Sequence, residues 1–378
     1  MSLDTPLRAN QRSQANAPCI TKTARVFLGA EDNPLLAPRG VHLVDGKLIV
    51  ADTGQNRVFI WNELPENTYQ QPDVVLGQVE KTRTNRNAGG QVSARSLLYP
   101  SGLWSDGKRL IVCDAWNHRV LIWHTFPTQD GQAADVAVGQ PSFEHNEPNV
   151  AGIGAPPTAQ SLHWPYGVDS DGQRLFIADT GNRRVLVFDK IPTTNYAKAD
   201  AVIGKKDFAD RDYDHTQAIW PYSVKLGFQG ELAITDTQYY RVLLLPSWQE
   251  SIKNETPTQP CIIGQETLEG NGQNQFRWFP EAHTLNWCYD SCFYQGGLLV
   301  ADTGNSRILH FKTLPTTNNH AADAILGQAS FQVGIENRNS IHATPNSLYW
   351  PFHLSLEKNT LVAADTGNHR IVIYSLDK

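Results

Sequence analysis

The residues of this sequence best suited to acid–base chemistry are Asp290 and His353. A carboxylate beside an imidazole can act as a general acid and base, or the two can supply metal ligands. Both occupy one repeated position, two residues after a recurring proline or its equivalent, where other repeats carry glycine or serine. Arg39 lies one residue away from this position in another repeat. We therefore expect Asp290, His353 and Arg39 to converge, either as a functional site or as a hydrogen-bonded structural plug.

The position one residue earlier is mostly aromatic. Its six members are Arg39, Ser101, Tyr166, Tyr222, Tyr289 and Phe352. Rings around one opening can line a pocket for an organic ligand, but they can equally pack one repeat against the next. The predicted ligand-binding residues are Arg39, Tyr166, Tyr222, Tyr289, Asp290, Phe352 and His353, with Asp290 and His353 as the catalytic candidates. Aromatic residues also recur just before the proline position, which favours packing: Tyr99, Trp164, Trp220, Trp287 and Trp350.

An aspartate and an arginine five residues apart recur six times along the chain. The pairs are Asp52/Arg57, Asp114/Arg119, Asp179/Arg184, Asp236/Arg241, Asp302/Arg307 and Asp365/Arg370. A catalytic site needs one copy, whereas a structural device needs one copy in every repeat. We expect the aspartate to accept backbone N–H groups in a turn, and the glycine two residues later to supply a positive φ. Two repeats depart from the pattern, with Ala115-Trp116 and with Gln238-Tyr239-Tyr240.

The elements that position these residues are short strands. Segments similar to LIVADTGQNRV (48–58) recur at intervals of 57 to 66 residues and occupy the whole chain. Each repeat contains four short apolar runs separated by turn signals. The second run is apolar at every position, so both of its faces must be covered. The sequence therefore predicts an all-β fold, a six-bladed β-propeller of four-stranded antiparallel blades.

The ring is predicted to close through the N-terminal strand. The last repeat ends after its third strand, and residues 24–30 (ARVFLGA) carry the pattern of the missing fourth strand. We expect residues 24–29 to pair with the strand near 370–375. Residues 1–22 are then an N-terminal extension and residues 23–378 a single propeller domain.

The repeated ADTGNxR followed by Val or Ile, with P-x-G-V before it, resembles the NHL repeat. The resemblance covers essentially the whole chain and recurs six times. It implies a propeller fold. It does not imply one function, because NHL propellers include protein-binding and RNA-binding modules and a lyase with metal in its channel, and similar propellers include lactonases.

Composition narrows the functional classes. The net charge of −6 makes nucleic-acid binding unlikely, since a phosphate backbone favours a basic partner. No run approaches 18 apolar residues, and no signal-peptide core is present, so we expect no membrane span. Five cysteines, an odd number, indicate a reducing compartment. We expect a cytoplasmic monomer.

Long connections between repeats favour a binding function on one face of the ring. The sequence contains no HExxH, GxSxG or CxxC motif, and no phosphate-binding GxxxxGK followed by Ser or Thr. We therefore expect a binding scaffold rather than an enzyme, whose partner is a protein or a small-molecule ligand held by the long-loop face and channel mouth. The alternative is a lyase or hydrolase at the channel mouth, with zinc or calcium as a candidate cofactor. His163, His283 and His353 are the histidines near that opening.

Overall fold

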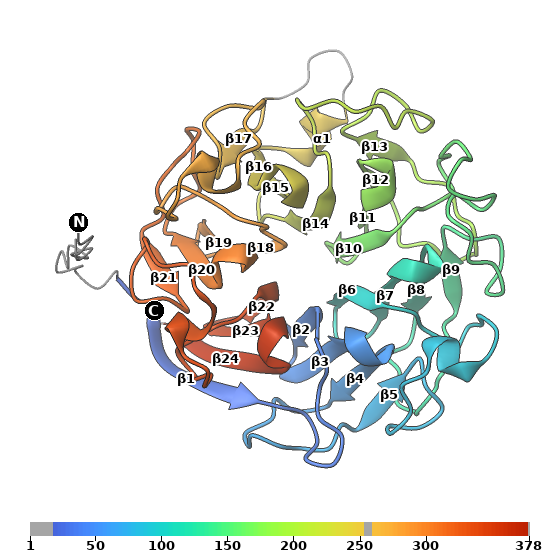
Figure 1. Cartoon of the computed structure of the whole chain (residues 1–378). Coiled ribbons are helices and arrows are strands. Elements are labelled where there is room, and N and C mark those ends of the chain that lie inside the picture. The colour runs from blue at the N-terminus through green and yellow to red at the C-terminus, as the bar shows by residue number, and fades with distance from the viewer. Residues whose placement is uncertain (1–17, 253–258, 377–378) are drawn as a thin grey trace, which may run out of the picture.

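The predicted six-bladed propeller is confirmed. The computed structural model describes residues 18–252 and 259–376, which form six four-stranded antiparallel sheets around a central axis (Figure 1). The first three blades are β2 (Gly40–Val44), β3 (Lys47–Asp52), β4 (Arg57–Trp61) and β5 (Val74–Leu76); β6 (Pro100–Ser105), β7 (Leu110–Asp114), β8 (Arg119–Trp123) and β9 (Val136–Val138); and β10 (Pro165–Ser170), β11 (Leu175–Asp179), β12 (Arg184–Phe188) and β13 (Ala201–Ile203).

The other three blades follow the same order of strands. They are β14 (Pro221–Leu226), β15 (Leu232–Asp236), β16 (Arg241–Leu245) and β17 (Cys261–Ile263); β18 (Asp290–Tyr294), β19 (Gly297–Asp302), β20 (Arg307–Phe311) and β21 (Ala324–Leu326); and β22 (Pro351–Glu357), β23 (Thr360–Asp365) and β24 (Arg370–Leu376), completed by β1 (Thr21–Phe27).

The helices of the described residues are short. Six 3₁₀ turns follow the second strands: η1 (Thr53–Gln55), η3 (Ala115–Asn117), η4 (Thr180–Asn182), η5 (Thr237–Tyr239), η7 (Thr303–Asn305) and η9 (Thr366–Asn368). Three more lie in the long connections: η2 (Arg86–Gly89), η6 (Gln273–Phe276) and η8 (Glu336–Asn339). One α-helical turn, α1, spans Trp248–Ser251. No helix in these residues has the length and hydropathy of a membrane span.

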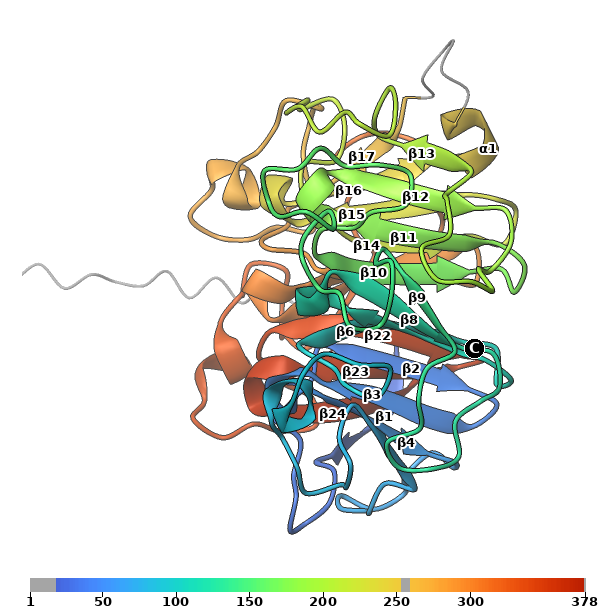
Figure 2. The ribbon, with the colours of Figure 1, turned by 90° about the vertical axis from the view of Figure 1, so that its right-hand side faces the viewer.

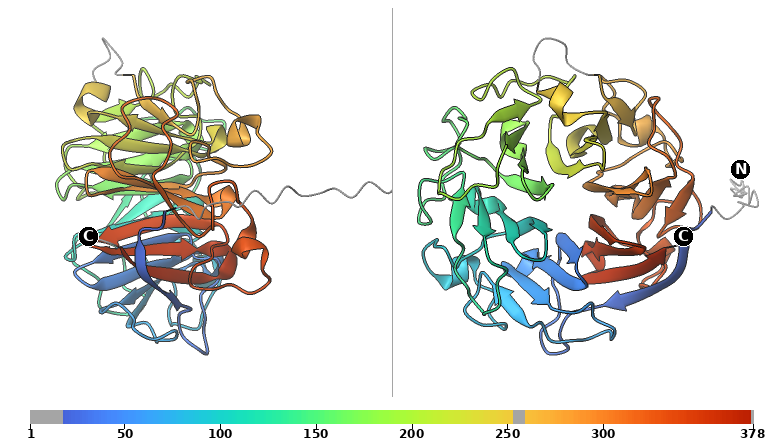
Figure 3. Two further views of the ribbon diagram at one scale, coloured as in Figure 1. Left: turned by 90° about the vertical axis from the view of Figure 1, so that its left-hand side faces the viewer. Right: turned by 180° about the vertical axis from the view of Figure 1, so that it is seen from behind.

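The closure of the ring is confirmed, and the closing strand is displaced along the chain. β1 pairs antiparallel with β24, with Val26 opposite Val372, and runs along the outside of the last blade (Figure 3). The strand ends at Phe27, three residues before the end of the predicted segment. The backbone leaves the sheet there because the Leu28 N–H donates to the carbonyl of Thr68 and Gly29 adopts a φ of 94°.

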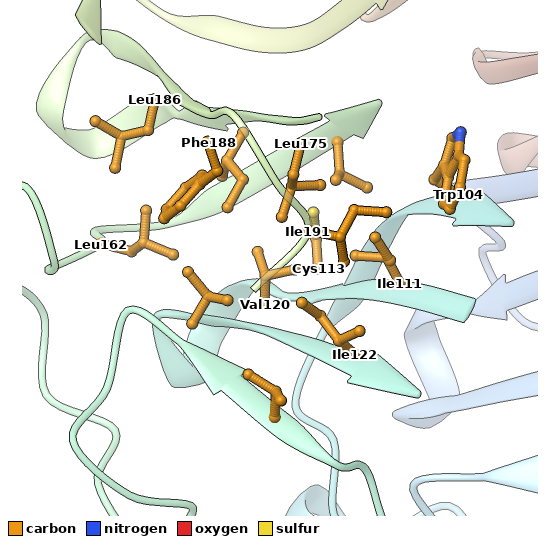
Figure 4. Close-up of a cluster of buried hydrophobic side chains, with 14 of the residues drawn as sticks. Trp104, Ile111, Cys113, Val120, Ile122, Leu162, Leu175, Leu186, Phe188 and Ile191 are labelled. Atoms are coloured by element: carbon orange, nitrogen blue, oxygen red, sulfur yellow. The ribbon is translucent and has the colours of Figure 1, made fainter. Parts of the chain in front are cut away.

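The hydrophobic core lies between neighbouring blades. Figure 4 shows one of six such clusters, in which Val120 and Ile122 of one blade face Leu175 and Phe188 of the next. The middle strands of each blade are buried on both faces, which explains their uninterrupted apolar sequences. All five cysteines are free.

The six Asp/Arg pairs are buried structural devices. In each pair the arginine Nε donates to the aspartate Oδ2 at 2.6–2.9 Å. The other oxygen accepts a backbone N–H from the chain before the first strand, as Asp302 does from Asn286 at 2.7 Å. The arginine also donates to carbonyls of two long connections, as Arg307 does to Phe331 in one and to Glu281 and Thr284 in the other. One pair thus fixes the turn and the loops beside it.

The expectation for the glycine in these turns is wrong. The positive φ belongs to the residue four positions after the aspartate, for example Asn56 at 52° and Ser306 at 51°. Glycine is needed for a close approach instead: a β-carbon at Gly54 would lie 2.6 Å from the Leu36 carbonyl oxygen, and one at Gly304 would lie 2.6 Å from the Asn286 side chain.

Candidate functional site

The strands around the axis pack in two different ways. At Gly40, Gly102 and Gly167 the neighbouring strand is so close that a β-carbon would lie 1.9–2.6 Å from its backbone oxygen. In the remaining blades the same position carries a side chain that reaches across to the next blade: Ser223, Asp290 and His353. The inner strands of the first three blades therefore pack by direct backbone contact. Those of the last three blades are bridged by polar side chains.

Asp290 is the centre of these bridges. Its carboxylate is fully buried and accepts the Ser223 hydroxyl at 2.6 Å and the Leu354 N–H at 2.8 Å. The Lys225 ammonium lies 3.8 Å away. Asp290 thus joins three successive blades, as the structural-plug alternative requires.

The structure brings the two catalytic candidates together. Nδ1 of His353 lies 3.5 Å from Oδ2 of Asp290 and 3.4 Å from the N–H of Val41. Burial, only partly offset by Asp290, lowers the pKa of His353 to about 3. The imidazole is therefore neutral at physiological pH.

One polar layer was missed in the sequence. Two residues further along the inner strands, His42, Asp169 and Lys225 face the same axis. Lys225 interacts with Asp290 and Asp169, and burial, partly offset by a backbone contact to Ser105, lowers the pKa of His42 to about 4. The alternation of side chains along a strand could have indicated this layer, because every second residue points in the same direction. A residue two positions after one that faces the axis therefore faces the axis as well.

Arg39 belongs to the aromatic layer and not to the Asp290 layer. Its guanidinium lies 4.2 Å from the centre of the Phe352 ring and 5.1 Å from that of Tyr99, within cation–π range. Within residues 18–252 and 259–376, no carboxylate forms an ion pair with it. The nearby Tyr222 hydroxyl is buried without a hydrogen bond of good geometry to any described residue.

The predicted aromatic residues form a continuous ring with Arg39. Successive ring centres lie 4.6 Å apart for Tyr166 and Tyr222, 4.6 Å for Tyr222 and Tyr289, and 4.1 Å for Tyr289 and Phe352. Tyr222 and Phe352 are buried and form the floor, whereas Tyr166, Tyr289 and Arg39 keep partial exposure. Burial raises the pKa of Tyr166 to about 12, so its hydroxyl stays protonated.

Tyr99 and Trp116 complete the ring where Ser101 has no aromatic group. Trp116 stacks on Tyr99 at 4.6 Å and donates its indole N–H to the Tyr166 hydroxyl at 3.3 Å. Trp116 replaces the usual turn glycine, so this departure from the repeat makes a contact at the site. We define the aromatic cup as Arg39, Tyr99, Trp116, Tyr166, Tyr222, Tyr289 and Phe352.

Four of the aromatic residues that precede the first strands share an unusual backbone conformation. Tyr99, Trp164, Trp287 and Trp350 all have a left-handed backbone, with φ between 46° and 57°. This conformation is unfavourable for a bulky residue. Trp287 and Trp350 nevertheless expose 43% and 44% of their surface, more than residues that only pack blades together.

Zinc and calcium have no ligand set in the part of the chain that the structure describes. No three side chains of histidine, cysteine, aspartate or glutamate come together there with the geometry of a metal site. His163 packs beside Trp164, His283 lies 3.5 Å from Glu281, and His353 lies at the axis.

These features define a six-bladed propeller with an aromatic cup at one mouth of its axis. Neither a protein-family model nor a curated protein matches the chain. Solved structures with a similar fold include a protein of unknown function from Bacteroides thetaiotaomicron (11% identity over 94% of this chain and 76% of that one, TM-score 0.53). They also include an auxiliary nutrient binding protein from the same organism (10%, 97% and 76%, TM-score 0.51) and a streptogramin B lyase (11%, 94% and 98%, TM-score 0.47). At these identities the likeness concerns the fold alone.

Proposed function

We propose that this chain is an NHL-type propeller that binds an organic ligand carrying a carboxylate or another anionic group in the aromatic cup. The main observation behind this proposal concerns Arg39. Its guanidinium lies between two aromatic rings and forms no ion pair with any described carboxylate. A partly buried cation without a counter-ion is unfavourable unless a ligand supplies one. The planar guanidinium fork matches a carboxylate in particular.

The surrounding rings support an organic rather than an inorganic anion. Tyr99 lies 5.1 Å from the Arg39 guanidinium, Trp116 stacks on Tyr99, and both rings are partly exposed. Such rings bind flat apolar groups, while a few polar groups fix their orientation.

The experiment compares 1-naphthaleneacetate with its neutral amide by calorimetric titration. We expect the acid to bind the wild-type chain about tenfold more tightly than the amide, as the loss of ~1.4 kcal/mol from a charge-assisted bond requires. Arg39→Gln should abolish this preference. The matched control is Arg83→Gln, an exposed arginine already paired with Glu80 at 2.9 Å, which should keep it. Equal affinity for acid and amide in the wild-type chain contradicts the proposal.

Catalysis is the second candidate, and the contact between Asp290 and His353 favours it. The two groups nevertheless lie 3.5 Å apart, beyond the range of about 2.6–3.2 Å for direct proton transfer, and both oxygens of Asp290 already accept other bonds. A screen of lactones and amides with the wild-type chain and His353→Gln tests it. Turnover that His353→Gln abolishes without lowering the melting temperature supports an enzyme, and no turnover by the wild-type chain counts against one.

A further inference from the structure

The exposed hydrophobic side chains gather on one face of the propeller. Twelve of the fourteen large exposed ones among the described residues lie in the long connections, in the segments before the first strands, or in the 3₁₀ turns; the other two are Tyr69 and Phe228. These connections project from one side of the disc (Figure 2). An uneven distribution of this kind marks an interaction surface.

Five of the exposed hydrophobic residues belong to two neighbouring connections, and two of the five, Trp278 and Ile341, are the most exposed of the fourteen. Phe276, Trp278 and Phe279 are exposed by 83%, 97% and 68%, and Ile335 and Ile341 by 47% and 94%. We call these five residues the blade 5/6 patch. The connections touch, since a β-carbon at Gly334 would lie 3.1 Å from Pro280.

The patch is held in place and arises from equivalent positions. The N–H of Asn274 donates to the carbonyl of Leu285, and that of Asn337 donates to Leu348. Trp278 and Ile341 each lie four residues after these asparagines. The corresponding residues in two earlier repeats are Gln91 after Asn87, which is polar, and Ile153 after Asn149, which is apolar and 64% exposed. Three of these four repeats thus present an apolar side chain at this position, and two of the three, Trp278 and Ile341, lie in adjacent connections.

The area of the patch suits a stable protein interface. At about 150–250 Å² for each aromatic side chain, the three aromatic residues expose on the order of 500 Å². The two isoleucines bring the total to roughly 700 Å², close to the ~800 Å² that each partner contributes to a standard interface. A monomer rarely exposes an apolar patch of this size.

We propose that the blade 5/6 patch is the interface of a face-to-face homodimer. The two-fold contact of such a dimer requires a surface complementary to itself. The patch meets this condition because its rim carries both signs of charge, with Arg277 and Arg338 beside Glu281 and Glu336. An anionic membrane would favour a basic rim, and this rim is balanced. The inference is independent of the ligand proposed for the aromatic cup.

The test is the mass of the chain in solution by sedimentation velocity and light scattering across the micromolar range. We expect the wild-type chain to show twice the monomer mass and the Trp278→Ser/Ile341→Ser variant to show the monomer mass. The variant should keep its melting temperature, because both side chains are exposed. Phe228→Ser is the matched control, since Phe228 is 85% exposed in the β14–β15 hairpin on the opposite face. It should remain a dimer.

Three results overturn the inference. The first is a wild-type monomer throughout, which is what the sequence alone led us to expect. The second is a dimer that survives the Trp278→Ser/Ile341→Ser changes. The third is a wild-type monomer that floats with phosphatidylcholine vesicles while the variant does not, which assigns the patch to a membrane surface.

Discussion

The side chains of Asn274 and Asn305 donate to each other, with Nδ2–Oδ1 distances of 3.1 and 2.8 Å. The same reciprocal pair recurs in three other blades: Asn87/Asn117, Asn149/Asn182 and Asn337/Asn368. A glutamine at the end of the fourth strand adds a second anchor, as Gln265 does by donating to the Gly272 carbonyl at 2.8 Å. The long connections are therefore preformed surfaces held by side chains of the repeat.

Asn305→Ala should loosen one connection and leave the others unchanged. The loss of the pair leaves the Thr284 hydroxyl as the remaining partner of the Asn274 side chain, so the Asn274 backbone amide, bonded to Leu285 at 2.9 Å, should exchange faster with deuterium. The connection around Asn87, which Asn117 holds, is the internal control. Hydrogen exchange by mass spectrometry measures both. Equal protection of Asn274 in the variant and the wild type would show that the pair does not hold the loop.

Arg307→Met should destabilise the fold by about 3–5 kcal/mol, because it leaves Asp302 charged and buried without its partner. Both side chains are fully buried. Arg83→Met is the control: Arg83 and Glu80 are 60% and 57% exposed, and such pairs contribute little. Urea unfolding gives the free energy of each variant. A loss at Arg307 no larger than that at Arg83 is the contrary outcome.

His353 should make the fold less stable in mild acid. Burial lowers its pKa to about 3, so between pH 6.5 and 3 the unfolded chain binds a proton that the folded chain does not. Stability therefore falls as the pH falls, by about 2 kcal/mol between pH 7 and 5 from this group. Asp290, Lys225 and His42 face it, and His42 contributes with the same sign.

His353→Gln removes that contribution, so the wild type should lose about 2 kcal/mol more than the variant between these pH values. Urea unfolding at pH 7 and pH 5 measures the difference. His342→Gln, at an exposed position, should behave as the wild type does. An equal loss in the wild type and His353→Gln would refute the prediction.

Deletion of residues 1–30 should open the ring and cause aggregation. It removes β1 and leaves the edge of β24 unpaired. It also removes Phe27, which is fully buried with its ring 5.0 Å from that of Trp61. Light scattering and thermal melting report the effect, with deletion of residues 1–17 as the control. The closure is unimportant if the shorter chain keeps the oligomeric state and melting temperature of the full one.

The fold was predictable because its information is repeated. Six copies of one motif indicate the blades, and a missing fourth strand with a matching N-terminal segment indicates the closure. The site was only partly predictable. Asp290 and His353 stand out in the sequence because other repeats carry a small residue at their position. Their contact could be expected because they occupy the same position in neighbouring blades.

Other features depend on distances that a sequence pattern does not contain. Glycine is required at position 54 because the Leu36 carbonyl lies too close to leave room for a β-carbon. Tyr99 is one of the aromatic residues before the proline position, whose recurrence favours a role in packing. Its backbone is left-handed, and its ring lies against Arg39. The exposure of Trp278 follows from the path of its loop, since the same residue type is buried at Trp61.

The pairing of β1 with β24 has a consequence during synthesis. β1 is the first strand of the propeller to leave the ribosome, and its partner β24 is the last. At roughly 5–20 residues per second, β1 waits for tens of seconds before its partner emerges. Throughout that time the nascent chain can complete five blades but not the sixth. Closure of the ring therefore waits until β24 has emerged, and the first strand of the propeller to be translated is the last to be paired.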